Sequence, residues 1–402
     1  MCEGGGRLIA QQKKILLTGA RSIFTLDLAR RLNEQGHRVY TAESMRLYLC
    51  RFSNAIEKHF TVPSPRFQTQ AFLSSLVDIA QRENIDYIIP NFEEIFYLAK
   101  GLDQFPDTCQ IFCPPYQLLN TLHNKWLFNQ TTKKWGFETP ESCLITHSSQ
   151  LNQHPLKRPY LLKPCYSRSA LRVIRVSEND APPTIDIHRH NPWIAQEYLS
   201  GKKFCSHSII HKGNLSSHVV YPVDFAINQS SSLNFEAIDH SAILDWVERF
   251  AKQARFTGQM GIDFIEQPNG KLYAIECNPR GTSGLHLFHS KDQLADIFFN
   301  QTQGLIIPEQ GRKRQIGLAM AVYGWKSLGS EKKLSTFLKK LLTTRDVIFS
   351  SKDIKPWLGQ LIIYPSYIWK CLTLRKSLPA MFTFDLDWNG EQLDLSNFSS
   401  RK

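Results

Sequence analysis

The stretch Gly261-Ile-Asp-Phe-Ile-Glu-Gln-Pro-Asn-Gly-Lys-Leu-Tyr-Ala-Ile-Glu-Cys-Asn278 decides the fold of this chain. Two runs rich in apolar residues flank Asn269-Gly270, which is the strongest short signal for a β-hairpin turn. With these two residues as the turn, Asp263 lies directly opposite Glu276 on the paired strand. Asn278 follows two residues later, on the same face of the hairpin.

This facing pair of carboxylates indicates a metal site. Opposed residues of an antiparallel pair have Cβ atoms roughly 5 Å apart, so two carboxylates there repel each other. A cation between them turns the repulsion into binding, and the hard oxygens of Asp263, Glu276 and Asn278 suit Mg²⁺. The alternative is an edge hairpin whose carboxylates face water, but the Pro279-Arg280 that follows at once favours the metal site.

The pattern Asp…Glu-x-Asn-Pro-Arg on a hairpin resembles the metal-binding hairpin of the ATP-grasp ligases, nearest to the carbamoyl-phosphate-synthase-like and biotin-carboxylase-like branch. The resemblance implies ATP as a cofactor, with two Mg²⁺ held on its phosphates by Asp263, Glu276 and Asn278; Mn²⁺ is also compatible. Arg280 is then expected to be catalytic, because its family equivalent stabilises the transferred phosphoryl group or the acyl phosphate.

The N-terminal sequence predicts a parallel sheet. Residues 13–18 form an apolar strand pattern, a turn and a helix with an apolar side follow, and 38–42 form the next strand, which together make a βαβ unit. Further strand and helix patterns reach about residue 115. Glu43 stands where a dinucleotide-binding domain carries its ribose-binding acid, but the turn has only Gly19 instead of a glycine-rich run, so the ligase resemblance explains this part better.

The predicted fold class is therefore α/β: an N-terminal doubly wound parallel-sheet domain, then a two-lobed α+β ATP-grasp domain, then a C-terminal extension. The expected boundaries are a disordered leader over 1–12, the first domain over 13–115, the ATP-grasp domain over 116–310 with its smaller lobe at about 140–200, and a basic extension over 311–402.

Lys163 ends a predicted strand, where a lysine can contact both a base nitrogen and a phosphate oxygen; we expect it to bind the nucleotide and to act in catalysis. The loop after it corresponds to the family's flexible, usually glycine-rich phosphate-covering loop. Here the loop contains no glycine, so Ser167, Arg168 and Ser169 are expected to supply the donors.

The segment 194–201 resembles the family's hinge, where adenine pairs with backbone groups; the match implies those of Gln196, Glu197 and Leu199. Lys203 follows, close to where the family often has a ribose-binding acid. Lys125 matches a lysine that reaches the α-phosphate, although a lone helical lysine is usually surface charge.

Composition bounds the class of protein. With 402 residues, 42% apolar and 21% charged, the chain is long enough for two or three globular domains. It has no run of about 18 apolar residues, so no membrane span is expected. The N-terminus lacks a secretory pattern, and the nine cysteines include no Cys-x-x-Cys pair, so we expect reduced thiols and a cytoplasmic location.

The net charge of +12 is uneven, because 312–345 holds nine basic residues and one acid, Glu331. Such a region attracts anions. It is either a solvated helix face or the border of an acceptor site for an anionic substrate. The apolar stretch Leu361–Leu374 is interrupted by Pro365 and is expected to pack in the core.

The resemblance implies an ATP-dependent ligase that activates a substrate carboxylate as an acyl phosphate and joins it to an amine or another nucleophile. The expected partners are small carboxylates and amines, with a homodimer as one open assembly. Two alternatives stay open: a degenerate nucleotide-binding or regulatory protein, and a basic nucleic-acid-binding protein, although no RNA-binding motif is present.

Overall fold

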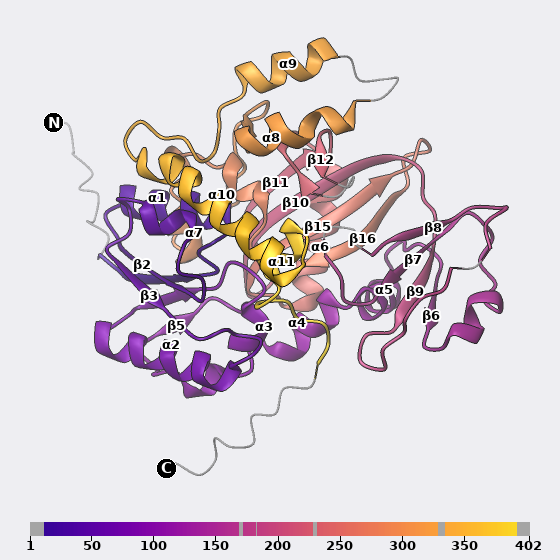
Figure 1. Cartoon of the computed structure of the whole chain (residues 1–402), viewed down its shortest axis with the longest axis horizontal. Coiled ribbons are helices and arrows are strands. Elements are labelled where there is room, and N and C mark those ends of the chain that lie inside the picture. The colour runs from indigo at the N-terminus through magenta and orange to yellow at the C-terminus, as the bar shows by residue number, and fades with distance from the viewer. Residues whose placement is uncertain (1–11, 169–171, 182, 228–230, 329–333, 392–402) are drawn as a thin grey trace.

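In a computed structural model the structure describes residues 12–168, 172–181, 183–227, 231–328 and 334–391. Apart from Gln12, the expected leader lies outside the described residues. Figure 1 shows the parallel sheet of the N-terminal part beside a large antiparallel sheet, with a smaller antiparallel sheet at the far side. The predicted fold class is confirmed in this architecture.

The N-terminal sheet is parallel throughout, in the order β3-β2-β1-β4-β5, with β1 at Lys14–Thr18 in its centre. Alternate residues of β1 enter different cores: Ile15 packs with the residues of α1 (Ile23–Glu34), and Leu16 with those of α2 (Thr69–Glu83). The two helices therefore cover opposite faces of the sheet, as expected for a doubly wound fold (Figure 1). The other elements of this part are β2 (Arg38–Glu43), η1 (Leu49–Phe52), β3 (Lys58–Thr61), β4 (Tyr87–Ile89), α3 (Ile95–Leu98), η2 (Leu102–Gln104) and β5 (Gln110–Ile111).

Two helices follow where the sequence predicts one helix over 118–135. Helix α4 spans Tyr116–His123 and α5 spans Lys125–Lys134. The single-helix prediction is wrong because Asn124 caps α5: its side chain accepts hydrogen bonds from the backbone N–H groups of Trp126 and Leu127. This break places Lys125 in the first turn of a new helix.

The smaller lobe is an antiparallel sheet in the order β6-β9-β7-β8. Its core is one small apolar cluster that includes Leu162 and Trp193. Its elements are β6 (Ser142–Ile145), η3 (Ser148–Asn152), β7 (Tyr160–Pro164), β8 (Ile174–Val176) and β9 (Trp193–Glu197).

The large sheet has the order β11-β10-β15-β16. One face packs under α6 (Ser241–Ala254), whose Trp246 and Phe250 are buried against Phe264 and its neighbours. The opposite face carries Asp263 and is covered by the segment after the hairpin. The elements are β10 (Lys202–His211), β11 (Asn214–Pro222), β15 (Gly258–Glu266), β16 (Leu272–Asn278), η4 (Ser283–Leu287), η5 (Ser290–Asp292) and α7 (Leu294–Phe298).

The hairpin keeps the predicted pairing by a different turn. The connection has three residues, 268–270, of which Gly270 takes a positive φ of 80°, so the prediction of a two-residue turn is wrong. A bulge between Asp263 and Phe264 then takes up the extra residue of the partner strand. Asp263 therefore still lies opposite Glu276, as predicted.

The C-terminal residues are integrated into the molecule. Strand β17 (Lys313–Gln315) pairs with β14 (Asn234–Glu236), and α10 (Lys355–Leu374) packs on η1. The prediction that Leu361–Leu374 packs in the core is wrong for much of the stretch, since Leu361 is 75% exposed and Trp369 68% exposed. The remaining elements are β12 (Ala226–Ile227), β13 (Ser231–Ser232), α8 (Gly317–Tyr323), η6 (Gly324–Ser327), α9 (Leu334–Thr343) and α11 (Leu378–Thr383).

Within the described residues, no helix is both long and apolar enough to cross a membrane. The eight cysteines in this part of the chain are free thiols, as the sequence predicts.

Candidate active site

The hairpin places two carboxylates face to face. Burial raises the pKa of Asp263, and the neighbouring charge of Glu276 raises it further, to about 6. The side chain of Asn278 follows on β16, and its Oδ1 lies 3.4 Å from a guanidinium nitrogen of Arg280. The repulsion between the two carboxylates costs free energy, and a cation bound between them would remove that cost.

The donor set fits Mg²⁺ shared with phosphates. Among the described residues, no group of three or more His, Cys, Asp or Glu side chains converges to form a complete metal cage. Two carboxylates and one amide oxygen are nevertheless what Mg²⁺ uses when substrate phosphates and water complete its shell. The site therefore suits a metal that arrives with a nucleotide.

Two lysines lie against these carboxylates. Lys125 is buried, its Nζ lies 3.5 Å from Glu276 Oε1, and it donates a 2.8 Å hydrogen bond to the carbonyl of Ser167. Lys163 is also buried at the end of β7; burial lowers its pKa, and the charge of Lys125 lowers it further, to about 8. Two neighbouring buried lysines of like charge favour the binding of an anion.

A buried glutamate that sequence reasoning missed joins the parts of this site. Glu93 accepts a 2.8 Å bond from Arg280 and a 2.6 Å bond from Arg168. Burial alone would raise the pKa of Glu93, but the two guanidinium groups outweigh it and hold that pKa well below its usual range. His123 lies 3.7 Å away, and its pKa falls to about 3 by burial, so it stays neutral. The sequence signal for this role is the acid pair Glu93-Glu94 inside the otherwise apolar run 92–98.

The predicted phosphate-covering loop follows β7. Ser167 is buried, and Arg168 is held by Glu93 and by Asp387, which lies 2.9 Å from its guanidinium. Ser169 lies outside the described residues. The guanidinium of Arg168 is thus already engaged with carboxylates, so a nucleotide phosphate would compete with Glu93 and Asp387 for it.

The predicted hinge residues end the central strand of the smaller sheet. Gln196 is paired on both sides, with Ser142 and Leu161, and the N–H of Glu197 donates to the carbonyl of Glu141. Leu199 is buried just beyond the strand. Lys203 is exposed on β10, which follows the hinge.

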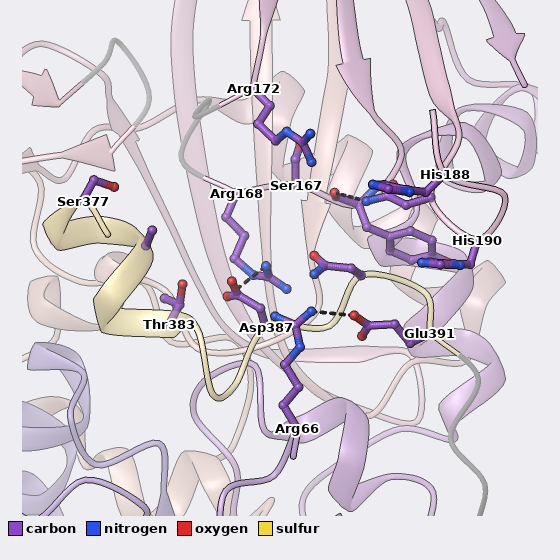
Figure 2. A pocket seen from close by; sticks show the side chains of 14 residues that line it. Arg66, Ser167, Arg168, Arg172, His188, His190, Ser377, Thr383, Asp387 and Glu391 are labelled. Atoms are coloured by element: carbon purple, nitrogen blue, oxygen red, sulfur yellow. Dashed lines mark hydrogen bonds and ion pairs between the residues drawn. The ribbon is translucent and has the colours of Figure 1, made fainter. Parts of the chain in front are cut away.

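A cavity of about 600 Å³ lies beside the loop (Figure 2). Arg172, His188 and His190 line one side, and residues near the C-terminus, including Asp387 and Glu391, line the other. Arg66 of the N-terminal part also lines it, so the smaller lobe, the N-terminal part and the C-terminal segment share its wall.

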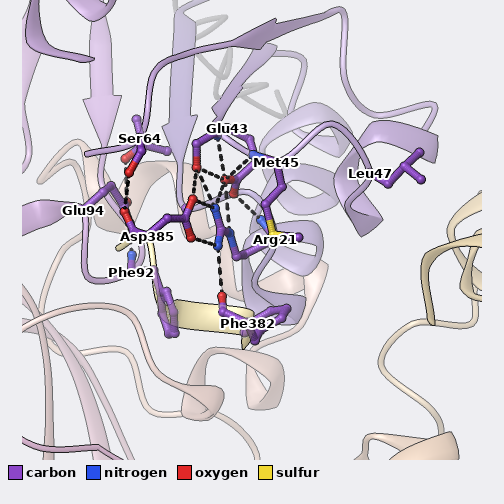
Figure 3. Close-up of polar contacts among 12 residues, drawn as sticks. Arg21, Glu43, Met45, Leu47, Ser64, Phe92, Glu94, Phe382 and Asp385 are labelled. Atoms are coloured by element: carbon purple, nitrogen blue, oxygen red, sulfur yellow. Dashed lines mark hydrogen bonds and ion pairs between the residues drawn. The ribbon is translucent and has the colours of Figure 1, made fainter. Parts of the chain in front are cut away.

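That C-terminal segment, residues 377–391, is here called the strap. It crosses the carboxyl ends of the parallel strands, which is the crevice where open α/β sheets bind ligands. Arg21 forms buried ion pairs with Glu43 at 2.5 Å and with Asp385 at 2.7 Å, and it donates to the carbonyl of Phe382 (Figure 3). Both carboxylate oxygens of Glu43 are bound by Arg21, so Glu43 serves this network.

His286 lies in η4, in the segment after the hairpin. It is buried and its Nδ1 lies 3.1 Å from Asp27 Oδ2 of α1. This contact ties the segment after the hairpin to the N-terminal part of the chain.

Residues 122–284 match the ATP-grasp domain family. The chain is 25% identical to an uncharacterized protein of Methanocaldococcus jannaschii over 69% of this chain and 72% of the relative. It is 23% identical to the D-alanine–D-alanine ligase of Rickettsia akari over 43% of this chain and 60% of that protein.

Among solved structures, N5-carboxyaminoimidazole synthetase from Staphylococcus aureus matches with a TM-score of 0.59 at 15% identity, covering 75% of this chain and 80% of that one. The same enzyme complexed with ADP matches with a TM-score of 0.57 at 16% identity over the same shares. Residues 122–284 thus match the family that the hairpin pattern predicts, and these solved structures share the fold of the chain.

Proposed function

We propose that this chain is an ATP-dependent ligase that activates a small carboxylate as an acyl phosphate and joins it to an amine. The observation that carries the proposal is the meeting of Asp263 and Glu276 with two buried lysines, Lys125 and Lys163. Carboxylates suited to a divalent cation beside buried cations suited to phosphates form a site for a metal–nucleotide complex. The named relatives, a D-alanine–D-alanine ligase and an ADP-binding synthetase, support this class.

In this proposal Asp263, Glu276 and Asn278 hold two Mg²⁺, which supply Lewis-acid stabilisation of phosphate charge. Lys163 and Lys125 neutralise phosphate oxygens, backbone groups of the hinge receive adenine, and the loop at Ser167 covers the phosphates. Lys203 is proposed to lie toward the ribose.

The chemistry has two displacements. An oxygen of the substrate carboxylate attacks the γ-phosphorus while its bond to ADP breaks, and ADP leaves. The amine nitrogen then attacks the acyl carbon, the bond to phosphate breaks, and phosphate leaves with the amine proton lost to solvent. Arg280 is placed by Glu93 to stabilise the charge that builds up at the transferred group.

A screen for ADP and phosphate release against pooled amino acids and small acids tests this function. Release that requires both an acid and an amine, and that fails in Glu276→Gln, supports it. Nucleotide binding without ADP release for any pair of acid and amine would favour a regulatory protein. The glycine-free loop and the ion pairs of Arg168 with Glu93 and Asp387 are the observations that support this alternative.

A further inference from the structure

Helix α10 presents an apolar face to the outside of the molecule. Its inward positions, Pro356, Gly359, Gln360, Ile363 and Tyr367, are buried. The exposed positions from 357 to 372 all carry apolar side chains: Trp357, Leu358, Leu361, Ile362, Pro365, Ile368, Trp369 and Leu372. The polar side chains of Ser366 and Lys370 among them are half-buried, and the exposed Thr373 follows at the end of this face. This is the reverse of a surface helix, which normally turns polar residues to solvent.

The exposure is large along the whole face. Leu361 is 75% exposed, Trp369 68% and Leu372 70%. Helix α10 lies flat on the protein, because Gly359 packs against Phe52, and the hydroxyl of Tyr367 donates to the backbone of Leu47. In Figure 1 it crosses the side of the molecule that faces the viewer. A contiguous apolar face of this kind marks an interaction surface.

The borders of the face are basic. No acidic residue occurs between Asp353 and Asp385, and Asp353 itself is buried in an ion pair with Arg30. The exposed basic residues at the two ends and beside η1 are Arg46, Arg51, Lys352, Lys355, Arg375 and Lys376. The face thus has an apolar centre, two exposed tryptophans and a positive rim.

We propose that α10 docks this protein on the surface of an anionic lipid bilayer, lying in the interface without crossing it. An interfacial helix buries its apolar side at the boundary of headgroups and acyl chains, tryptophan favours that boundary, and basic residues meet anionic headgroups. A second copy fits less well: a two-fold pairing of antiparallel helices sets Arg375 and Lys376 of one copy against Lys352 and Lys355 of the other. This inference does not depend on the proposed ligase reaction.

Flotation of the full chain with vesicles tests the proposal. We expect the protein to float with phosphatidylcholine vesicles that contain phosphatidylserine, to float poorly with pure phosphatidylcholine, and to be released by salt. Leu361→Ser/Trp369→Ser should weaken binding by about tenfold or more, since each change removes an exposed apolar side chain that the bilayer would bury. Arg375→Ala/Lys376→Ala should weaken it about fivefold per charge.

Two controls separate the surface from general effects. Ile307→Ser removes another exposed apolar side chain, at 52% exposure and outside α10, and should leave binding unchanged. Leu361→Met/Trp369→Phe keeps the face apolar and should retain binding. Absence of vesicle binding overturns the proposal, as does equal binding to neutral vesicles. The proposal is also overturned if the native chain binds no vesicles but forms an oligomer that Leu361→Ser/Trp369→Ser dissociates. That result would assign the face to a second copy.

Discussion

At the residue scale, the facing carboxylates of the hairpin repel each other, and a metal ion between them would relieve this repulsion. The pKa of Asp263 is about 6 in the folded chain, against an ordinary value of 3.8, because of burial and the charge of Glu276. A raised carboxyl pKa means that the folded state binds the proton more tightly than the unfolded state. Stability therefore falls as pH rises from about 4 to 6, and it stays lower above that range.

Asp263→Asn removes this repulsion. Without nucleotide or metal, the variant should melt roughly 1 to 3 °C above the native chain at pH 7.5 and show no gain at pH 4. Scanning calorimetry at the two pH values measures the difference, and Mg²⁺-dependent binding of a non-hydrolysable ATP analogue should be lost in the same variant. A lower melting temperature at pH 7.5 would show that the carboxylate is structural.

Lys163 gives a second prediction, on nucleotide affinity. Its pKa of about 8 means that phosphate groups meet a protonated lysine below pH 8 and a neutral one above it. Affinity should fall about tenfold between pH 7 and pH 9, because binding must then also take up a proton. Lys163→Arg keeps its charge and should flatten the profile. Calorimetric titration measures the nucleotide affinity across this pH range. An affinity of the native chain that does not change with pH would show that Lys163 does not bind the phosphates.

At the element scale, the sequence pattern predicted those helices and strands that depend on interactions between residues close along the chain. The βαβ start, the hairpin pair and the strand that ends at Lys163 all follow from apolar periodicity and turn residues. The break between α4 and α5 depended on one capping side chain, Asn124, inside a helical pattern. The exposed face of α10 could not be predicted, because the sequence pattern of an apolar helix is the same whether or not other elements cover the helix.

The strap is an element whose anchor can be tested. Trp388 is fully buried between Phe96, Tyr97 and Tyr116, and the Tyr97 hydroxyl donates to the carbonyl of Asp387. Trp388→Ala should cost about 3 to 5 kcal/mol of unfolding free energy if the strap is part of the cooperative fold. Urea unfolding measures this loss, with Trp325→Ala, at a tryptophan that is 54% exposed, as the matched control. A loss below about 1 kcal/mol, with faster proteolysis confined to the C-terminus, would show that the strap detaches alone.

At the scale of the whole molecule, the site is assembled from distant parts of the chain. Glu93, just after β4, binds Arg168 of the smaller lobe and Arg280, which follows β16, and Asp387 of the strap also contacts Arg168. Sequence reasoning found the hairpin because its partners are adjacent along the chain. It missed Glu93 because its partners are 75 and 187 residues away.

Glu93 and Glu94 form a matched pair for the last prediction, because both are buried and their pKa values move in opposite directions. Burial raises the pKa of Glu94 above its ordinary value, whereas the two arginines overcome burial and lower that of Glu93. Glu93→Gln leaves two buried guanidinium groups short of their shared carboxylate and should cost about 3 kcal/mol or more. Glu94→Gln, whose carboxyl has no such partner, should cost less than about 1 kcal/mol.

The pH dependence separates the two variants further. A depressed pKa contributes stability that is present above the ordinary value of 4.5 and is lost as pH falls, so the cost of Glu93→Gln should shrink on going from pH 7 to acid. Denaturant unfolding of both variants at pH 7 and pH 4 tests this. Equal costs for the two substitutions at pH 7 would mean that Glu93 does not join the lobes. Its loss should also lower turnover through Arg280, while Glu94→Gln leaves turnover near that of the native chain.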